Sequence, residues 1–385
     1  MRKIYVDNSS TSFPKAPGVS DVIKEFIDNV GCNINRGGYE DSYNVALEIL
    51  EARQTISDMF HSGDPQEVVF TPSVTHSLNM LLQGYLKKGD HAITTSMEHN
   101  SVMRPLQALS KVGVSYDVIN CEVDGSLNVE NITPLIKKET KAIIMLHASN
   151  VCGTIMPIDK VSKICRKHGL KLIVDAAQTA GALDIDAGRV DALAFAGHKG
   201  LLGPQGIGGF IIKKEFANDI KPLIMGGTGS KSNDFEQPEI LPDKFESGTM
   251  NIPAILGLKR AIEYINSIGI KQIYKKEIEL TSIFLTMLQE VKGTRIIGKS
   301  STADRVAVVS IDFPQMDNAE IAATLFEKYR IMTRCGLHCA PAAHKTLNTY
   351  PLGTVRFSFG YFNTVEDIDY IIESIKEIVG KKHGF

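Results

Sequence analysis

A lysine and an aspartate occupy positions in this chain from which both could serve one reaction. Lys199 lies in a glycine-rich stretch, Ala-Phe-Ala-Gly-His-Lys-Gly-Leu-Leu-Gly-Pro-Gln-Gly-Ile-Gly, over residues 194–208. Asp175 and Gln178 close an apolar, strand-like run, Leu-Lys-Leu-Ile-Val-Asp-Ala-Ala-Gln. A lysine amine forms a Schiff base with an aldehyde, and an aspartate keeps a pyridine nitrogen protonated, so that the ring accepts electrons. Together, in this order, the residues predict a site for pyridoxal 5′-phosphate (PLP).

A site for the phosphate of that cofactor is expected at the start of a helix. A predicted strand, Glu67–Phe70, is followed by Thr-Pro-Ser-Val-Thr-His-Ser-Leu-Asn, in which Ser73, Val74 and Thr75 open the helix. Backbone N–H groups at a helix N-terminus, with the hydroxyls of Ser73 and Thr75, suit a bound phosphate. An ordinary helix cap is the alternative, and the lysine and aspartate elsewhere in the chain favour the phosphate site.

Further polar residues follow predicted strands or lie in one. His99, in Met-Glu-His-Asn, is expected to lie flat on the pyridine ring, and Asn150, in His-Ala-Ser-Asn, to reach the phenolic oxygen, as is Gln178. Arg356 lies in an apolar strand and therefore needs a partner. Bidentate binding of a substrate carboxylate is the functional interpretation, and an internal salt bridge is the alternative.

The elements that must position these groups alternate along the chain. Strand-like runs alternate with helical patterns from about residue 65 to 212, which predicts an α/β fold, with a mostly parallel seven-stranded sheet and helices on both faces. Ligands of such sheets bind at the carboxyl ends of the strands, where Asp175 and Lys199 both fall. The expected strands are Glu67–Phe70, His91–Thr95, Ser115–Asn120, Ala142–His147, Lys171–Asp175, Ala192–Ala196 and Ile207–Ile212, with helices at Ser77–Leu86 and Pro157–His168.

A Gly-, Ser- and Pro-rich stretch, residues 226–248, predicts a mobile loop and a domain boundary. We expect a large cofactor-binding domain over residues 15–250. A smaller α+β domain, residues 251–385 together with 1–14, is expected to follow. Its predicted elements are helices 254–267 and 272–291, strand Arg305–Phe313, helix Ala319–Tyr329, strand Thr354–Gly360 and a last helix with an apolar stripe.

Composition argues against several other classes of protein. The 42 Lys and Arg residues are balanced by 44 Asp and Glu residues, so no basic excess exists to bind nucleic acid or a membrane surface. No window of about 18 apolar residues occurs, and the N-terminus turns polar too soon for a signal peptide. The six cysteines are scattered, which is typical of reduced thiols. We therefore expect a cytoplasmic protein without a membrane span.

A set of motifs spread over essentially the whole chain resembles one family. They are Tyr-Val-Asp-Asn-Ser-Ser-Thr, Asn-Ile-Asn-Arg-Gly, Ser-Val-Thr-His-Ser-Leu-Asn, Glu-His-Asn, Val-Asp-Ala-Ala-Gln, Gly-His-Lys, Phe-Glu-Ser-Gly-Thr-Met-Asn and Arg-Cys-Gly-Leu-His-Cys-Ala-Pro. The chain resembles class V aminotransferases, and within them the cysteine desulfurases and selenocysteine lyases of the SUF sulfur-mobilisation type. The resemblance implies the fold-type I architecture of PLP-dependent transferases. It also implies a homodimer with two active sites near the subunit interface.

The resemblance implies a role for each matching residue. Lys199 resembles the Schiff-base lysine, Asp175 the partner of the pyridine nitrogen, and Cys339, in the small domain, the catalytic nucleophile that accepts sulfur. Arg356 resembles the arginine that binds the substrate carboxylate, and Arg334 is assigned to the substrate with it. The remaining implied contacts are His99 on the ring, Gln178 and Asn150 near the phenolic oxygen and the substrate, Thr75 and His198 on the phosphate, and Thr249 on the phosphate from the partner subunit.

The chain departs from the family pattern at two places. Ala196 stands where a hydroxyl residue is usual, which leaves one phosphate hydrogen bond open. Leu337 replaces the first histidine of the usual His-His-Cys-Ala, and Cys335 adds a second thiol. The nearby charges of Arg334 and His338 favour the thiolate of the catalytic cysteine. No metal site is expected, because the group Cys335, His338, Cys339 and His344 lacks a second ligand pair at zinc spacing.

The expected function is that of a PLP-dependent cysteine desulfurase. L-Cysteine would become L-alanine with a persulfide on Cys339, which a sulfur-acceptor protein would receive for iron–sulfur clusters or another transfer. The alternatives are a selenocysteine lyase, another class V aminotransferase and another PLP lyase. An aminotransferase or a generic PLP lyase would need Lys199 and Asp175 but not Cys339. A non-catalytic protein that kept the fold is a third interpretation, to which Ala196 gives mild support.

Overall fold

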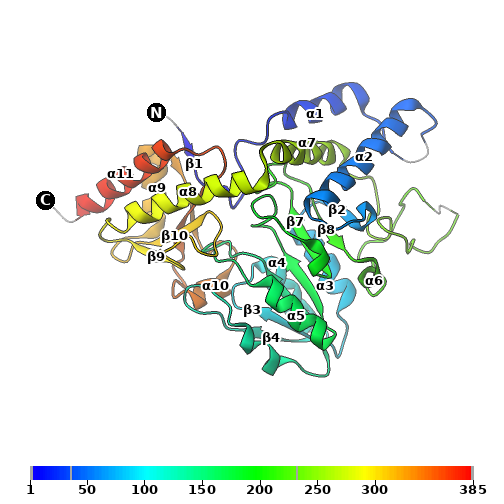
Figure 1. Cartoon of the computed structure of the whole chain (residues 1–385), viewed down its shortest axis with the longest axis horizontal. Helices are drawn as coiled ribbons and strands as arrows, with labels where there is room; N and C mark the ends of the chain where they lie inside the picture. The colour runs from blue at the N-terminus through cyan, green and yellow to red at the C-terminus, as the bar shows by residue number, and fades with distance from the viewer. Residues whose placement is uncertain (1–2, 35–36, 231–232, 383–385) are drawn as a thin grey trace.

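A seven-stranded sheet forms the centre of the larger lobe in the computed structural model (Figure 1). The strand order is β2-β8-β7-β6-β5-β3-β4. β8 runs antiparallel to both of its neighbours, and the other neighbouring strands are parallel, so the predicted mostly parallel sheet is confirmed. The strands are β2 (Val68–Thr71), β3 (His91–Thr95), β4 (Ser115–Ile119), β5 (Thr140–Leu146), β6 (Lys171–Asp175), β7 (Ala192–Ala196) and β8 (Gly208–Ile212).

The structure describes residues 3–34, 37–230 and 233–382. Asn35 and Arg36 of the Asn-Ile-Asn-Arg-Gly motif lie outside the described residues, as do Lys231 and Ser232 of the predicted loop. None of the described helices combines the length and the apolar character needed to cross a bilayer.

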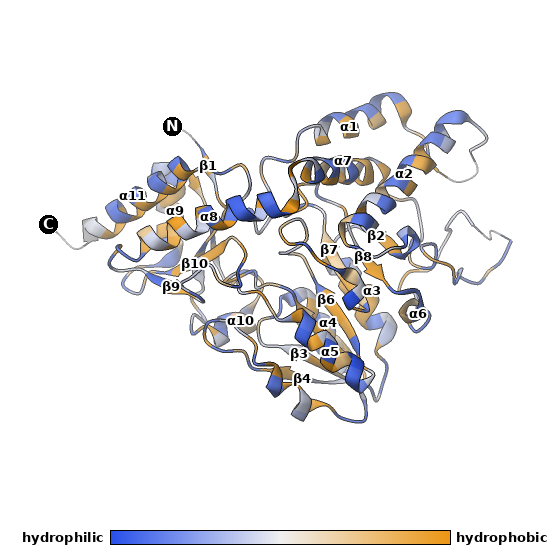
Figure 2. Cartoon of the chain, viewed as in Figure 1, coloured by the Kyte–Doolittle hydropathy of each residue, from blue (hydrophilic) through white to orange (hydrophobic). Residues whose placement is uncertain are grey.

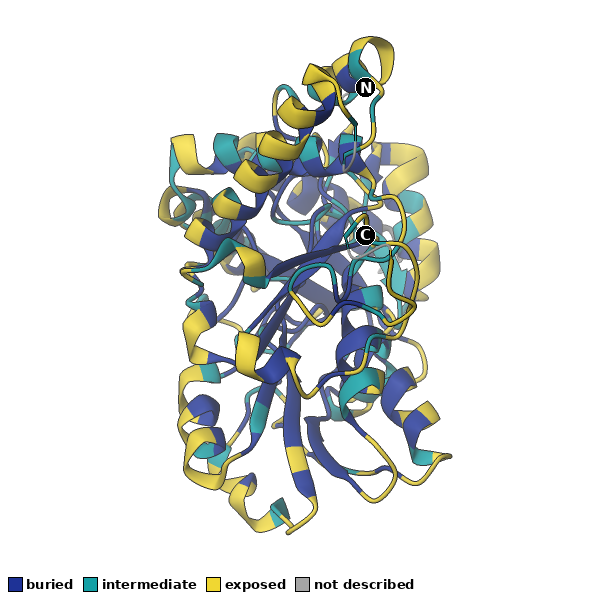
Figure 3. Cartoon of the chain, turned by 90° about the vertical axis from the view of Figure 1, so that its right-hand side faces the viewer, coloured by how far each residue is buried: buried dark blue, intermediate teal, exposed yellow. Residues whose placement is uncertain are grey.

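Both faces of the sheet are covered by helices, and β7 shows how its side chains divide between them. Leu193 and Phe195 pack into one apolar core with α1, α2, α5 and α7, whereas Ala192 and Ala194 face a second core with α3, α4 and α6. Because successive side chains of a strand point to opposite faces, a strand covered on both sides is apolar throughout. β6, β7 and β8 are accordingly largely apolar (Figure 2), and their residues are buried except for the half-buried Lys171. Figure 3 shows that the strands at the centre of the molecule are mostly buried. The helices are α1 (Val19–Glu25), α2 (Glu40–Met59), α3 (Val74–Tyr85), α4 (Asn100–Ser110), α5 (Ile158–His168), α6 (Lys214–Ala217) and α7 (Ile252–Ile268).

The smaller lobe contains a four-stranded antiparallel sheet, β12-β13-β10-β9, and three long helices, which agrees with the predicted α+β region. The start of the chain joins this lobe, because β1 (Ile4–Tyr5) pairs in parallel with β11 (Ile331–Met332). The remaining elements are α8 (Ile270–Leu288), β9 (Arg295–Ile297), β10 (Val308–Asp312), α9 (Asn318–Tyr329), β12 (Arg334–Gly336), α10 (Pro341–Thr346), β13 (Thr354–Ser358) and α11 (Val365–Lys382).

Helices α7 and α8 lie in succession between the two lobes (Figure 1). The buried face of α7 packs into the core of the large sheet, through residues such as Ile255 and Ile262. α8 instead contributes Phe284 and Leu285 to the core of the small lobe. A domain boundary near residue 250 stays a prediction. Because α7 packs on the large lobe and α8 on the small one, we propose that the boundary between the two domains falls after α7, close to Gly269.

Candidate active site

Parallel strands of the large sheet end at one edge, and four of them, β3, β5, β6 and β7, end at or lead to residues selected from the sequence. β6 ends at Asp175, and β7 leads into His198 and Lys199. β3 leads to His99, and β5 leads to Asn150. The topology therefore gathers at the carboxyl edge of the sheet the side chains that the sequence predicts to act together.

Asp175 is buried at this edge, with 5% of its surface exposed. Its Oδ1 accepts a hydrogen bond from the backbone N–H of Ala177 at 2.9 Å, and the Ser101 hydroxyl donates to Oδ2 at 3.5 Å. Burial raises the pKa of the Asp175 carboxyl, because it disfavours the charged form. A cation bound beside Asp175 would favour the charged carboxylate again. The protonated nitrogen of a pyridine ring is such a cation.

Lys199 is partly buried in the turn after β7. Desolvation lowers the pKa of its amine from 10.5 to about 8; the charge of Asp175 opposes this shift and that of Arg356 adds to it. An appreciable fraction of the amine is therefore neutral near neutral pH and able to act as a nucleophile or a base. Lys199 also lines a small cavity of about 50 Å³ with Gln178 and Glu277. The Gln178 amide donates to the carbonyl oxygen of Ser9 at 3.1 Å.

His99 caps the N-terminus of α4. Its Nδ1 accepts the backbone N–H of Ser101 at 3.0 Å and lies 2.9 Å from the Ser101 hydroxyl. Burial, followed by the charges of Lys199 and Arg334, lowers the pKa of His99 to about 4, so the ring is neutral near pH 7. Ser101 contacts both His99 and Asp175, and no motif in the sequence had pointed to it.

Oδ1 of Asn150 and Nδ1 of His198 are among the buried atoms at the site that have no hydrogen-bond partner within the described part of the chain. The Asn150 amide nitrogen is occupied, donating to the carbonyl oxygen of His338 at 2.7 Å. Burial lowers the pKa of His198 to about 4. Buried polar atoms normally find partners, and unpaired ones mark places where a ligand completes the bonding. Both residues are among those predicted to contact PLP, so the site fits that cofactor.

The predicted phosphate site at the start of α3 has the geometry of a helix cap. The Ser73 hydroxyl accepts the backbone N–H of His76 at 3.2 Å, Val74 is buried and Thr75 is exposed. The backbone of β8 approaches closely, since a Cβ at Gly208 would lie 3.1 Å from the backbone of Ser73 and Val74. Ala196, at the end of β7, is buried in the core beneath this region.

Thr249 lies apart from the other predicted residues. It is exposed and lines two cavities, of about 480 Å³ and about 270 Å³, whose linings include neither Lys199 nor Asp175 nor Cys339. The smaller of these cavities is also lined by Thr71, at the end of β2, and by His76, in the first turn of α3. The structure of one chain thus brings Thr249 near the start of α3 but not to the lysine.

Cys339 lies in a tight turn between β12 and α10. His338 and Cys339 both adopt left-handed backbone conformations, with φ of 48° and 58°. Such conformations are costly for residues other than glycine and concentrate at functional sites. Two hydrogen bonds hold the turn: the N–H of Asn100 donates to the Cys339 carbonyl at 2.8 Å, and Asn150 donates to the His338 carbonyl at 2.7 Å. The turn leaves Cys339 exposed to solvent.

Two arginines flank this turn and share one hydroxyl. Arg334 donates to the Ser10 hydroxyl at 2.7 Å, and its other terminal nitrogen lies 3.9 Å from the Cys339 sulfur. Arg356 is buried, donates to the same hydroxyl at 2.7 Å and to the carbonyl oxygen of Asn150 at 3.0 Å, and pairs with Asp7 at 2.8 Å. The internal salt bridge considered for Arg356 is therefore present. Its Nε has no partner among the residues that the structure describes.

The second thiol of this segment points elsewhere. Cys335 lies between Arg334 and Gly336 in β12 and packs against the core of the small lobe. Burial raises the pKa of its thiol. Successive residues of a strand face opposite sides, so Arg334 lies on the side of Cys339 and Cys335 on the side of the core. Within the described residues, no cluster of three or more His, Cys, Asp or Glu side chains is arranged to hold a metal ion.

Comparison with known proteins extends this picture to the whole chain. Residues 4–371 match the family model described as Aminotransferase class-V. A protein of Pyrococcus abyssi named "Probable cysteine desulfurase" is 33% identical, covering 98% of this chain and 94% of the relative. A protein of the same name from Methanothermobacter thermautotrophicus is 31% identical, covering 98% and 95%. The apo structure of a cysteine desulfurase from Thermococcus onnurineus NA1 matches with a TM-score of 0.92 and 31% identity, over 98% of this chain and 95% of that one.

Proposed function

The chain belongs to the class V aminotransferase family, and we propose from this membership and the site geometry that it is a PLP-dependent cysteine desulfurase. Its architecture is that of the fold-type I PLP enzymes, and PLP is the cofactor of the family. The observation that carries the desulfurase assignment is the exposed thiol of Cys339, beside Arg334 and within electrostatic reach of Lys199. An ordinary aminotransferase needs no thiol there.

When bound, PLP supplies an aldehyde that condenses with amines and a ring that accepts electrons from the α-carbon of an amino acid. Lys199 would hold the aldehyde, Asp175 the ring nitrogen and His99 the face of the ring. The other contacts that we assign are Asn150 and Gln178 to the phenolic oxygen, and Ser73, Val74, Thr75, His198 and Thr249 to the phosphate.

Lys199 is the base that takes the α-proton of the substrate in this proposal. Its neutral amine, favoured because burial lowers its pKa to about 8, can accept that proton. We assign the substrate carboxylate to Arg356, whose Nε is free of protein partners in the described chain, with Arg334 beside it. The two guanidiniums would orient the amino acid with its sulfur toward Cys339.

Cys339 then takes the sulfur of the substrate. Its thiolate attacks that sulfur; an S–S bond forms while the C–S bond of the substrate breaks, and the electron pair of the broken bond goes to carbon. That carbon gains a proton and becomes the methyl group of alanine. L-Cysteine and the Cys339 thiol thus give L-alanine and a Cys339 persulfide, with no external oxidant or reductant.

We also propose a homodimer. Helix α2 exposes Tyr43, Leu47 and Leu50, which at this spacing form an apolar stripe on the face of the helix turned away from the core. The segment of Thr249 borders this stripe, because Leu50 and Thr249 line the same cavity. Contiguous exposed apolar surface of this kind is typical of protein interfaces. We propose that a second copy packs on this stripe and that Thr249 contacts the phosphate of the partner subunit across the interface.

The persulfide needs a recipient, and the exposure of Cys339 supports transfer to a sulfur-acceptor protein. The free thiols of all six cysteines are compatible with a cytoplasmic location, since cytosolic thiols stay reduced.

The decisive experiment is an assay of the PLP-loaded protein with L-cysteine. Equal amounts of alanine and released sulfur are expected, with the extra sulfur mapped to Cys339 by mass spectrometry before reductant is added. L-Selenocysteine is run in parallel, as is an amino acid with a keto acid. Turnover of selenocysteine alone would favour the lyase, and keto-acid exchange without sulfur release would favour an aminotransferase.

A further inference from the structure

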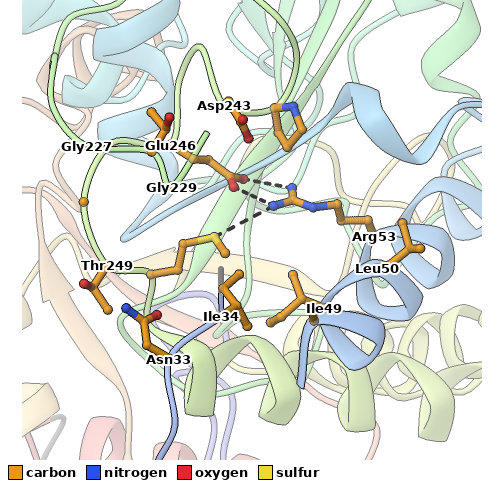
Figure 4. Close-up of a pocket in the computed structure, with 15 residues that line it drawn as sticks. Asn33, Ile34, Ile49, Leu50, Arg53, Gly227, Gly229, Asp243, Glu246 and Thr249 are labelled. Atoms are coloured by element: carbon orange, nitrogen blue, oxygen red, sulfur yellow. Dashed lines mark hydrogen bonds and ion pairs between the residues drawn. The ribbon is translucent and has the colours of Figure 1, made fainter. Parts of the chain in front are cut away.

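A buried ion pair joins helix α2 to the segment that carries Thr249 (Figure 4). Arg53 and Glu246 meet through two hydrogen bonds, Nη1 to Oε1 at 2.8 Å and Nη2 to Oε2 at 2.5 Å. Their side chains are only 7% and 5% exposed. Glu246 lies in the motif Phe-Glu-Ser-Gly-Thr-Met-Asn, but the sequence had assigned neither Arg53 nor Glu246 a role at the site.

The pair also occupies the free edge of the large sheet. β2 is the outermost strand there, and no strand of the described residues pairs with its other edge. Arg53 Nη1 donates to the carbonyl oxygen of Val68 at 2.5 Å, and Glu246 Oε1 accepts the N–H of Phe70 at 2.6 Å. The guanidinium lies 4.7 Å from the centre of the Phe70 ring. The ion pair therefore bonds to β2 much as a further strand would, and fixes α2, β2 and residue 246 relative to one another.

Strand β2 and the segment of Glu246 each lead to a residue that we assign to a PLP phosphate. β2 ends at Thr71, two residues before Ser73 caps α3. Glu246 is three residues before Thr249, and Arg53 also reaches the sulfur of Met250 at 3.8 Å. Thr249 is exposed in the lining of the cavity and lies between Glu246 and Met250, both of which Arg53 contacts (Figure 4).

Stability alone does not account for a pair of this kind. Replacing a buried ion pair by well-packed apolar residues is often neutral or stabilising, because desolvation of the charges offsets their attraction. The two parallel hydrogen bonds of the pair do, however, fix the distance and the orientation between helix α2 and the 246–250 segment more narrowly than apolar packing would.

We propose that Arg53 and Glu246 are positioning residues that present Thr249 to the phosphate of the PLP bound by the partner subunit. The proposal rests on the assignment of Thr249 to that phosphate. In this arrangement Arg53 touches neither the cofactor nor the substrate, and acts only through the placement of the 246–250 segment.

The test compares the binding of PLP with that of pyridoxal, which lacks the phosphate. Arg53→Lys keeps the charge but loses the two-pronged contact, and Glu246→Gln keeps the shape and an acceptor for the N–H of Phe70. Each variant, as apoprotein, should bind PLP about tenfold more weakly, as expected for one lost charge-assisted hydrogen bond, and pyridoxal within about twofold of the wild type. The ³¹P resonance of bound PLP should shift in both variants.

A double-mutant cycle identifies the route of the effect. If the pair acts through Thr249, Arg53→Lys should add little to the loss of PLP affinity already caused by Thr249→Val. Lys259→Met is the matched control: Lys259 pairs α7 with Glu48 and Glu51 of the same helix α2, at 2.5 Å each, without touching β2 or the Thr249 segment. Its ratio of PLP to pyridoxal affinity should equal that of the wild type.

Distinct outcomes separate this proposal from the proposed function. Equal losses of PLP and pyridoxal affinity, or losses that simply add to that of Thr249→Val, would overturn the positioning role. A Thr249→Val protein with unchanged PLP affinity would overturn it as well, while leaving the desulfurase assignment standing. A wild-type protein that binds no PLP would instead refute the proposed function. If Arg53→Lys does not fold, Glu246→Gln carries the comparison, since its amide preserves the volume of the buried side chain.

Discussion

The guanidinium of Arg334 lies beside the sulfur of Cys339, with 3.9 Å between Nη2 and Sγ. The residues are close because β12 carries the arginine and the left-handed turn at His338 and Cys339 folds the chain back toward it. The hydrogen bond from Arg334 to Ser10 holds the guanidinium in place on its other side. A cation fixed next to the sulfur stabilises negative charge that develops there during nucleophilic attack.

Arg334→Met should therefore slow the alkylation of Cys339 by iodoacetamide at pH 7. We expect a loss of about fivefold, since opposite charges about 4 Å apart in a solvated site interact by roughly 1 kcal/mol. Lys345→Met, which removes a cation of α10 that stacks on Tyr350, is the control and should alkylate at the wild-type rate. Equal rates for all three proteins would show that Arg334 does not influence the sulfur.

The incorporation of PLP into the apoprotein should follow the neutral fraction of Lys199. Its pKa is lowered to about 8 by burial, so the neutral amine increases as the pH rises through 8 and is nearly complete above it. The rate of incorporation should rise across pH 7 to 9 and then level off, rather than climb toward the ordinary value of 10.5. Borohydride reduction followed by peptide mapping should place the label on Lys199, and a label on another lysine would contradict the assignment.

Cys339→Ala should lose L-cysteine desulfuration while keeping PLP. The expected drop is at least about a thousandfold, the scale of loss when an enzyme loses its nucleophile. The visible absorbance and the binding of substrate should remain, because the cofactor contacts come from other residues. Selenium leaves carbon more readily than sulfur does, so residual activity is expected on selenocysteine. Wild-type turnover of L-cysteine by this variant would point to a generic PLP lyase.

Cys335→Ser should retain most of the activity. The side chain faces the core of the small lobe, and burial raises the pKa of its thiol, so it is poorly placed for sulfur transfer. A cost within about 1 kcal/mol of unfolding free energy is expected from the exchange of a half-buried thiol for a hydroxyl. Steady-state assays beside Cys339→Ser provide the comparison; matching losses would mean that both thiols take part.

Glu98→Gln should change how stability depends on pH. The Glu98 carboxyl is buried, accepts from the Thr95 hydroxyl at 2.6 Å and from the N–H of Leu146 at 3.0 Å, and burial raises its pKa to about 8. In the unfolded chain the pKa is about 4.3. Between these values the folded protein retains a proton that the unfolded chain has released, so the carboxyl destabilises the fold increasingly from about pH 4 to 8.

Glutamine has no such titration, so the melting temperature of Glu98→Gln relative to the wild type should rise with pH. The difference should grow by about 1–3 °C between pH 5 and 8.5, which corresponds to roughly 1–2 kcal/mol in a chain of this size. Parallel melting curves across that range would mean that Glu98 is not protonated in the folded protein.

The sequence predicted well those elements whose pattern is local. The ends of β6 and β7 agree with prediction, because each is an unbroken apolar run bounded by polar or turn residues. Helix α2 was not predicted, since Tyr43 and Leu47 make its exposed face apolar too and blur the usual contrast. β1 and β11, of two residues each, are too short to show any period.

The same distinction applies to the site. Residues at strand ends, such as Asp175 and Lys199, could be found because the edge of a parallel sheet is implied by the order of its strands. Ser101, Ser10 and the Arg53–Glu246 pair could not, because their contacts arise only when distant segments pack. Arg356 was predicted in part: the sequence showed that a guanidinium in an apolar strand needs a partner, but not that the partner is Asp7.

That last contact has a consequence for how the protein is made. Asp7 and Arg356 are 349 residues apart in the chain, and Asn8 and Ser9 also bond to Ser358 across a similar separation. During translation the segment of Asp7 must wait until Arg356, 349 residues later, has emerged from the ribosome. Contacts that close such long loops form late, because their entropic cost is met only when the intervening structure is in place. The lysine and its sheet edge are synthesised much earlier, so we expect a nascent chain to be ready for its cofactor before it can recognise an amino acid.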